Sequence, residues 1–155
     1  MSNAPIGLFR NELAVVTGSA SNIGRAIATA LAAEGAEGVL CDVDPARNAE
    51  TLSGITAAGN KARAVTADLS VRDGWKAVME ALGAATPHML VHSACPRRHE
   101  VDKPLSVAEE SFDAMLTTNV RSGCLLGREI GRRMKDNGVK GRMLFITSLH
   151  AESPR

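Results

Sequence analysis

The sequence predicts an α/β fold in which helices cover both faces of a doubly wound parallel sheet. Short apolar runs alternate along the chain with segments of helical periodicity, and this alternation is typical of sheets built from β-α-β units. The apolar runs are almost continuous, as expected for strands that are buried on both faces. We therefore expect the strand order 3-2-1-4-5, without the C-terminal strands of the full doubly wound pattern.

Five short runs rich in aliphatic residues are the expected strands, because turn-forming or polar residues bound them. In chain order they are Leu13–Thr17, Gly38–Asp42, Ala62–Ala67, His88–Ser93 and Arg142–Thr147. The segment Pro96–Pro104 after the fourth run is charged and contains two prolines. We expect it to be a polar surface loop near the ligand crevice.

The first two helices are recognised by their ends. Apolar residues recur at helical spacing from residue 22 to about 33, and Gly35 ends this helix. Asp44 and Pro45 then provide an N-cap and a first-turn proline for a helix that extends to about residue 58.

The third and fourth helices begin at patterns that resemble capping boxes, in which a serine is followed three residues later by an acid. Ser70-Val-Arg-Asp73 opens a helix that continues through residue 82. Ser106-Val-Ala-Glu109 opens a long helix that ends near residue 136, before an Asn-Gly pair.

Composition excludes several classes of function. The net charge of +1 gives no electrostatic basis for binding nucleic acid or a membrane surface, and no apolar run approaches the ~18 residues of a membrane span. The four histidines show no metal-ligand spacing, so we expect no metal site. Cys41, Cys95 and Cys124 are far apart in sequence. We expect them to be reduced thiols in a cytoplasmic protein.

The segment from Thr17 to Gly24 connects the first strand to the first helix and has the composition of a pyrophosphate-binding turn. Gly18 allows a tight turn, and the small residues after it let the backbone approach phosphate oxygens. Asn22 stands where glycine is usual and is the next-best residue for a left-handed conformation. Gly24 lets the helix pack close to the strand. The expected cofactor contacts in this turn are Gly18, Ser21, Asn22, Ile23 and Gly24.

Asp42 ends the second strand, 18 residues after Gly24. An acid near this offset accepts hydrogen bonds from the adenine ribose and repels a 2′-phosphate. Asp42 therefore favours NAD over NADP, although Arg25 and Arg47 lie close enough in sequence to weaken the preference. The alternative is a solvated acid at a strand end.

With these motifs the chain resembles the short-chain dehydrogenase/reductase family, whose sheet is of the Rossmann type. Four further segments match family motifs: Asp68-Leu69, Leu90-Val-His-Ser-Ala-Cys95, Asn119-Val120 and the strand that ends at Ser148. The resemblance implies that Asp68, Leu69, Ser93, Ala94 and Cys95 contact the cofactor. It implies that Ser148 holds the substrate oxygen and that Asn119 supports a water chain.

Two of these positions have alternative interpretations. Asp68 is also suited to capping the turn that follows it. Cys95 stands where the family has glycine, and we expect it to be a small buried side chain rather than a reactive thiol.

The resemblance also implies a Tyr-x-x-x-Lys pair that supplies the reaction proton, but the sequence contains no tyrosine. We expect this pair beyond Arg155. We interpret residues 1–155 as a single dinucleotide-binding domain, incomplete at its C-terminal end and inactive without Tyr and Lys.

The long helix carries Asn119, Gly123, Gly127 and Gly131 at steps of four residues, which forms a stripe of small side chains. Three glycines inside a helix cost roughly 1 kcal/mol each relative to alanine, so a close contact with this face is expected. The stripe either packs against the chain's own sheet or contacts another subunit, since the family commonly pairs subunits through this helix. We expect a homo-oligomer formed through the helix 106–136.

Together with Asp42, the resemblance implies an NAD-dependent oxidoreductase that transfers a hydride between the cofactor and a small alcohol or ketone. Two alternatives stay open: a dinucleotide-binding protein without catalysis, and a truncated pseudo-enzyme that serves only as an oligomer partner. NADH titration and turnover of carbonyl compounds distinguish the three.

Overall fold

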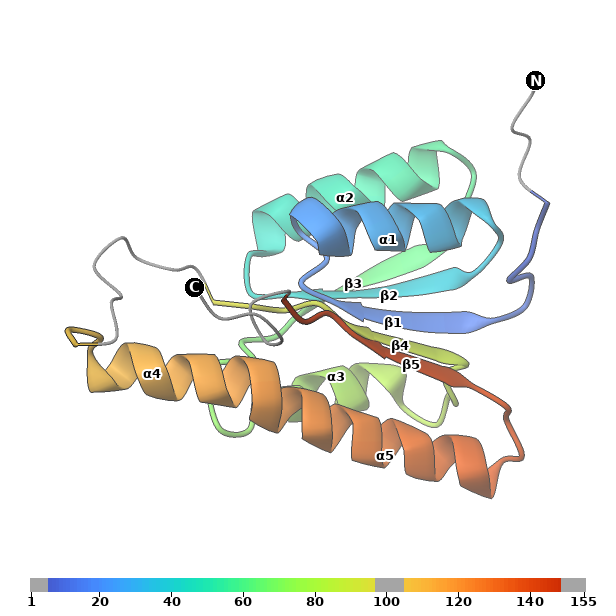
Figure 1. The fold of residues 1–155 in the computed structure, drawn as a ribbon. Helices are drawn as coiled ribbons and strands as arrows, with labels where there is room; N and C mark the ends of the chain where they lie inside the picture. The colour runs from blue at the N-terminus through green and yellow to red at the C-terminus, as the bar shows by residue number, and fades with distance from the viewer. Residues whose placement is uncertain (1–5, 97–104, 149–155) are drawn as a thin grey trace.

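A computed structural model describes residues 6–96 and 105–148 (Figure 1), so most of the expected polar loop at 96–104 lies outside the described residues. The strands are β1 (Leu13–Thr17), β2 (Glu37–Asp42), β3 (Ala62–Thr66), β4 (Met89–His92) and β5 (Arg142–Phe145). The helices are α1 (Asn22–Ala33), α2 (Pro45–Ala57), α3 (Trp75–Leu82), α4 (Glu109–Met115), the π-helical turn η1 (Leu116–Ser122) and α5 (Gly123–Asp136).

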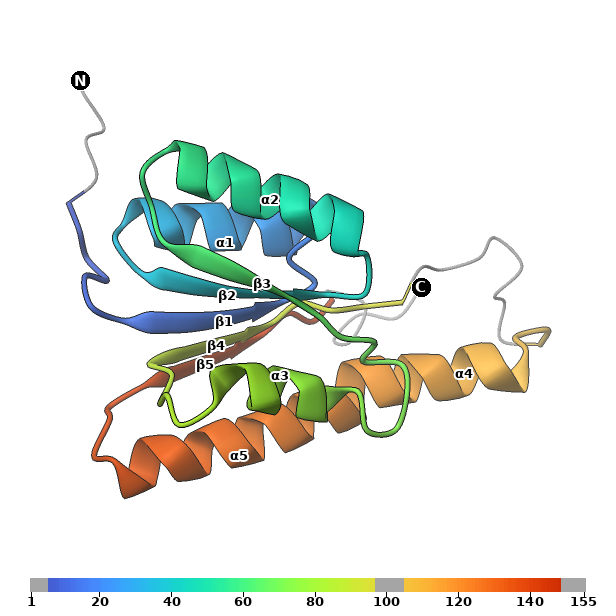
Figure 2. The same ribbon diagram turned by 180° about the vertical axis from the view of Figure 1, so that it is seen from behind.

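The sheet has the order β3-β2-β1-β4-β5 with every pair parallel, which confirms the predicted topology. Helices α1 and α2 cover one face, and α3 and α5 cover the other (Figures 1 and 2). Successive strand residues point to opposite faces. Val15 therefore packs with the residues of α3 and α5, whereas Val16 packs with those of α1 and α2.

Two predicted helix starts are confirmed and two are wrong. Helix α1 begins at Asn22 as predicted. Asp44 caps α2 through a hydrogen bond from the Arg47 N–H, with Pro45 in the first turn. Helix α3 begins at Trp75 rather than near Ser70.

The cause of the later start of α3 is the side chain of Asp68. Its Oδ1 accepts hydrogen bonds from the Ser70 hydroxyl at 2.6 Å and from the Ser70 N–H at 2.9 Å. A turn therefore forms where the capping box was expected.

The long helix differs from its prediction at its start and in its middle. It begins at Glu109 after the N-cap Ala108, which has no polar side chain, so the Ser106 capping box is not the start. The segment Leu116–Ser122 is π-helical, a conformation that occurs mostly as single turns, frequently at functional sites.

The stripe of glycines packs against the chain's own sheet, which is the first of the two alternatives. A Cβ at Gly123 would lie 2.8 Å from His92 Cδ2, and one at Gly127 would lie 3.3 Å from Phe145 Cζ. Helix α5 thus approaches β4 and β5 closely because it lacks side chains at these positions.

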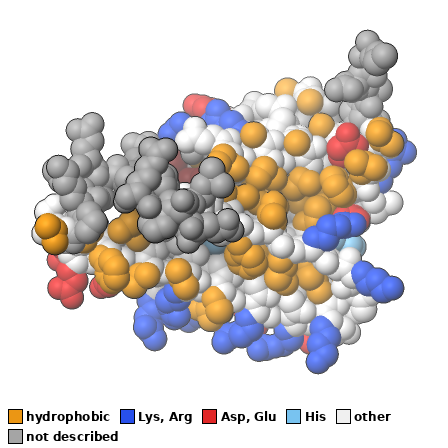
Figure 3. Space-filling view, in the orientation of Figure 1, with side chains coloured by type: hydrophobic (Ala, Val, Ile, Leu, Met, Phe, Trp, Pro, Cys, Tyr) orange, Lys and Arg blue, Asp and Glu red, His pale blue; other side chains and the backbone are white. Residues whose placement is uncertain are grey.

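Strand β5 is an edge of the described sheet. It carries exposed apolar side chains: Met143 is 37% exposed, Leu144 51% and Phe145 44%. Hydrophobic side chains gather over this strand on the face seen in Figure 3. No helix within residues 6–96 and 105–148 is both long and apolar enough to cross a lipid bilayer.

Candidate cofactor-binding site

The turn between β1 and α1 is built around two glycines in close backbone contact. Gly18 has φ +69°, and a Cβ there would lie 2.8 Å from the Ser93 carbonyl oxygen. A Cβ at Gly24 would overlap the carbonyl oxygen of Gly18. Only glycine fits at either position, so the start of α1 lies directly against the ends of β1 and β4.

The first turn of α1 has the form of an anion-binding site. Asn22 has φ +46°, the left-handed conformation that was expected for it. Ser21 is the N-cap in an extended conformation, and within the described residues its side chain makes no capping hydrogen bond. The first N–H groups of the helix therefore lack a side-chain cap and are suited to phosphate oxygens.

Asp42 connects the end of β2 to this turn. Its Oδ2 accepts a hydrogen bond from the Ala20 N–H at 2.9 Å, and its Oδ1 accepts one from the Asp44 N–H at 3.0 Å. Each carboxylate oxygen has two acceptor positions, so the half-buried carboxylate retains capacity for a ribose hydroxyl beside the turn.

The site also contains polar residues that sequence analysis missed. Asn48 is fully buried on α2, where its Nδ2 donates to the Leu40 carbonyl and its Oδ1 accepts from the Ser19 hydroxyl, both at 2.9 Å. Thr51 donates to the Ser19 carbonyl at 3.1 Å. Helix α2 thus fixes the turn from Thr17 to Gly24 (the phosphate turn) through these buried hydrogen bonds. The available signal was the spacing of Asn48, Thr51 and Ile55, which places polar groups on the inward face of the helix.

The end of β4 lies beside the same turn. The Thr17 hydroxyl oxygen accepts hydrogen bonds from the N–H groups of Ser93 at 3.1 Å and Ala94 at 3.2 Å. Ser93 and Ala94 are half-buried, whereas Cys95 is exposed. The expectation of a buried Cys95 is therefore wrong, because the chain leaves the sheet after His92 and carries this residue to the surface.

The Asp68-Leu69 pair is placed less directly. Asp68 is exposed and caps the turn to Ser70, in agreement with its alternative interpretation. Leu69 is only 5% exposed and belongs to the core under α3. Its side chain therefore packs inside the protein, and a ligand at this position would meet its backbone.

The two residues with expected catalytic roles are both exposed. Ser148 follows β5, on the side of the sheet where the C-terminal ends of β1 and β4 also lie. Asn119 lies in the π-helical turn, next to Thr118, whose carbonyl oxygen is 3.0 Å from His92 Nε2. His92, at the end of β4, is a further residue of this region that sequence analysis did not single out.

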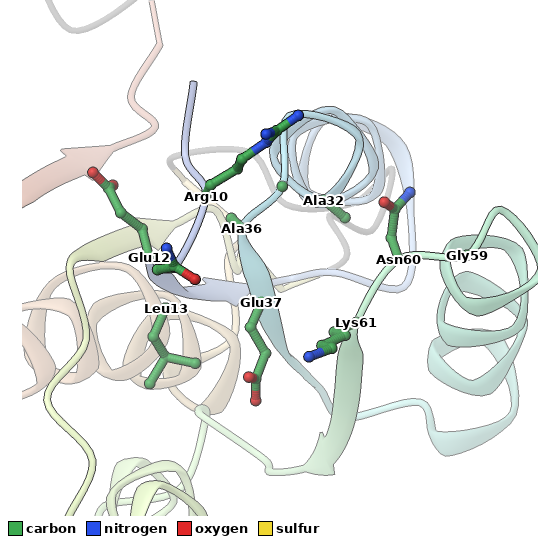
Figure 4. A pocket seen from close by; sticks show the side chains of 11 residues that line it. Arg10, Glu12, Leu13, Ala32, Ala36, Glu37, Gly59, Asn60 and Lys61 are labelled. Atoms are coloured by element: carbon green, nitrogen blue, oxygen red, sulfur yellow. The ribbon is translucent and has the colours of Figure 1, made fainter. Parts of the chain in front are cut away.

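The structure has a separate cavity of about 380 Å³ at the N-terminal ends of the strands. Figure 4 shows that residues before and at the starts of β1, β2 and β3 line it, among them Arg10, Glu12, Glu37 and Lys61. It lies away from the strand ends that carry the turn, so it is not part of the candidate cofactor-binding site.

The residues at the strand ends fit a dinucleotide. The glycines at 18 and 24 let the turn pack tightly against the ends of β1 and β4, the start of α1 lacks a side-chain cap and is suited to a pyrophosphate, and Asp42 is hydrogen-bonded to this turn. Within the described residues, no group of three His, Cys, Asp or Glu side chains could hold a metal ion.

Several known proteins are similar to this chain. The probable oxidoreductase EphD of Mycobacterium tuberculosis is 34% identical over 97% of this chain and 25% of its own length. The (3R)-3-hydroxyacyl-CoA dehydrogenase of Rattus norvegicus is 31% identical over 91% of this chain and 58% of its own. A 3-oxoacyl (acyl-carrier-protein) reductase from Agrobacterium tumefaciens, solved with NADP bound, aligns with a TM-score of 0.86 and 28% identity.

That reductase covers the whole of this chain, which covers 59% of the reductase. The chain thus spans between a quarter and about three fifths of the length of these relatives. The sequence model of the family described as short chain dehydrogenase matches residues 12–155. Motifs, sheet order and similarities agree, and the chain belongs to the short-chain dehydrogenase family.

Proposed function

We propose that this chain is the cofactor-binding part of an NAD(P)-dependent oxidoreductase that transfers a hydride between a nicotinamide cofactor and a small alcohol or carbonyl compound. The observation that carries the proposal is the turn at Gly18 and Gly24, whose tight packing places an uncapped helix start, a group suited to a pyrophosphate, at the ends of β1 and β4. The cofactor supplies the redox chemistry, and the chain binds and orients it.

The residues of the chain have distinct parts in this proposal. The N–H groups of the first turn of α1 hold the pyrophosphate, and Asp42 accepts hydrogen bonds from the adenine ribose. Ser148, at the same C-terminal ends of the strands, donates a hydrogen bond to the substrate oxygen. Asn119 orients water. We propose that residues 1–155 alone bind the cofactor without turnover, since they contain no tyrosine to move the hydroxyl proton. A dinucleotide-binding protein without catalysis is the alternative, and turnover by the full-length protein distinguishes the two.

The three cysteines provide a direct test of cofactor binding that does not require turnover. Burial raises the pKa of the Cys41 thiol to about 12, with the nearby Asp42 carboxylate adding to the effect, so Cys41 is expected to resist alkylation. Cys95 is exposed beside the turn, and Cys124 is exposed on α5. We expect NADH or NADPH at ten times its Kd to slow iodoacetamide labelling of Cys95 about tenfold.

Labelling is measured for each cysteine by mass spectrometry of peptides. Cys124 is the internal control, and its labelling rate should not change when the cofactor is added. Equal rates at Cys95 with and without saturating cofactor would contradict binding at this turn.

Asp42 is proposed to give a preference for NAD, although structural relatives contain bound NADP. Its carboxylate would lie close to a 2′-phosphate and repel it. We expect Asp42→Ala to raise the Kd for NADH roughly tenfold, because the loss of one charge-assisted hydrogen bond costs about 1.5–3 kcal/mol. The difference between the Kd values for NADH and NADPH should therefore become smaller. Fluorescence titration with both cofactors measures this. Asp73→Ala, on the exposed turn before α3, is the matched control; an unchanged cofactor preference in Asp42→Ala would remove Asp42 from this role.

We also propose a homo-oligomer that forms through the helix at 106–136, and a cytoplasmic location. The glycine stripe is occupied by the chain's own sheet, so another face of the helix must make the contact. Phe112, Leu116 and Val120 support this, because they are exposed apolar residues at steps of four. Light scattering of the full-length protein tests the assembly.

The free thiols of all three cysteines support the proposed cytoplasmic location.

A further inference from the structure

His92 occupies a buried position between two parts of the site. It is 3% exposed at the end of β4. Its Nδ1 lies 3.0 Å from the Thr17 hydroxyl oxygen on β1, and its Nε2 lies 3.0 Å from the Thr118 carbonyl oxygen in the π-helical turn. One imidazole ring thus connects the strand that precedes the phosphate turn to the turn that carries Asn119.

The hydrogen bonds define the tautomer of this ring. The Thr17 oxygen already accepts the N–H groups of Ser93 and Ala94, so its single proton is directed to His92 Nδ1. Nδ1 is therefore the acceptor, and Nε2 carries the proton that is donated to the Thr118 carbonyl. The ring is neutral, because a second proton on Nδ1 would face the proton of the Thr17 hydroxyl.

Packing holds the ring in this position. A Cβ at Gly123 would lie 2.8 Å from His92 Cδ2, so the glycine at the start of α5 is what leaves room for the ring. The Phe145 ring of β5 lies 6.2 Å from it, tilted by 57°. The Thr118 carbonyl also accepts the Ser122 hydroxyl at 2.6 Å. Two side chains thus hold one carbonyl of the π-helical turn.

We propose that His92 is a positioning residue that ties two parts of the site together in its neutral Nε2–H tautomer. One part is the end of the cofactor site formed by Thr17, Ser93 and Ala94, and the other is the π-helical turn that carries Asn119. Its effect on catalysis rests on the proposed function, whereas the tie itself rests on the contacts above. Protonation of the ring breaks the bond to Thr17, so the tie is lost in acid.

The described charged side chains on the elements around His92 do not stabilise its protonated form. Strand β1 has no charged residue. On β5, Arg142 is paired with Glu12; η1 and the start of α5 carry Arg121 and the Arg128–Glu129 pair. Burial lowers the pKa of His92 from its ordinary 6.5, against the opposing effect of backbone hydrogen bonds to Thr118 and Asn119.

The sign of the pH effect follows from this direction. Because the unfolded chain binds the proton more readily, the contribution of His92 to stability is complete above pH 6.5 and is lost as the pH falls below 6.5 toward the folded-state pKa.

Two substitutions separate the two hydrogen bonds in the full-length protein. The side-chain amide of His92→Asn lies where Nδ1 was and retains the acceptor for Thr17, whereas that of His92→Gln reaches the position of Nε2 and retains the donor to Thr118. We expect His92→Asn to lower kcat with little change in the cofactor Kd. We expect His92→Gln to raise the cofactor Kd. Each effect should be roughly two- to thirtyfold, the range for residues that couple two sites.

The second measurement is the midpoint of thermal unfolding from about pH 8 to about pH 5. The wild-type protein should lose stability below pH 6.5, and both His92 variants should lack that component. His88→Asn is the matched control, because His88 lies before the opposite end of β4 and accepts the Leu13 N–H through its Nδ1.

Outcomes are distinguishable from failure of the proposed function. If the wild-type protein binds no NADH or NADPH, the proposed function fails, while the unfolding profile still tests the tie. Equal pH profiles for wild type and both His92 variants would overturn the tie. Equal changes of kcat and Kd in both variants would reduce His92 to a structural residue.

Discussion

The substitution Gly24→Ala is expected to destabilise the protein by about 3 kcal/mol, the upper part of the range for overpacking a tight contact. The added Cβ would overlap the Gly18 carbonyl oxygen, and backbone cannot move aside as the end of a flexible side chain can. Helix α1 must therefore shift away from β1, which also opens the phosphate turn. Urea unfolding followed by circular dichroism measures the loss, and NADH titration should show weaker binding.

The matched control is Gly54→Ala on α2. Apart from its chain neighbours and the backbone of its own helix, no described atom lies within 4 Å of a Cβ at Gly54, so this change should stabilise the protein by up to about 1 kcal/mol through helix propensity. A Gly24→Ala protein as stable as Gly54→Ala would show that the turn is looser than described.

The substitution Ser148→Ala in the full-length protein is expected to reduce kcat about 100- to 1000-fold, the usual cost of removing one hydrogen-bond donor at a reacting oxygen. The Kd for NADH should stay unchanged, because Ser148 follows β5 and the cofactor contacts are proposed on β1, β2 and β4. Steady-state rates with a panel of ketones and alcohols, together with NADH titration, separate the two effects.

Ser53→Ala, on the exposed surface of α2, serves as its control and should leave both kcat and Kd unchanged. If Ser148→Ala turned over at the wild-type rate, Ser148 would not hold the substrate oxygen, and the proposed reaction would need a different donor.

The order of elements could be predicted because buried parallel strands are apolar on both sides, and Val15 and Val16 show this directly, each packing under a different pair of helices. The cap at Asp44 was predictable because it depends on residues within one turn. The start of α3 was not predictable, because the Ser70 hydroxyl binds the upstream Asp68 instead of forming a capping box with Asp73.

The parts of the site that escaped prediction depend on contacts between distant segments. The π-helical turn is one such part, because the Thr118 carbonyl is held by a histidine 26 residues away. Asn48 is another, since its role requires α2 to lie against the phosphate turn. Motifs indicated the glycines and Asp42, whose chemistry is local, but the polar residues behind the turn carry no motif of their own.

The π-helical turn at Leu116–Ser122 has a consequence for the register of the helix that contains it. A π-helical turn pairs residues i and i+5 where an α-helical turn pairs i and i+4, so its hydrogen-bonded ring contains one more residue. Gly123 and Gly127 fix the later end here, through their contacts with His92 and Phe145. Removal of one residue from this segment is thus expected to change the local helix type while α5 keeps its register on the sheet. Such a deletion would move the residue beside Thr118 without a change in the rest of the fold.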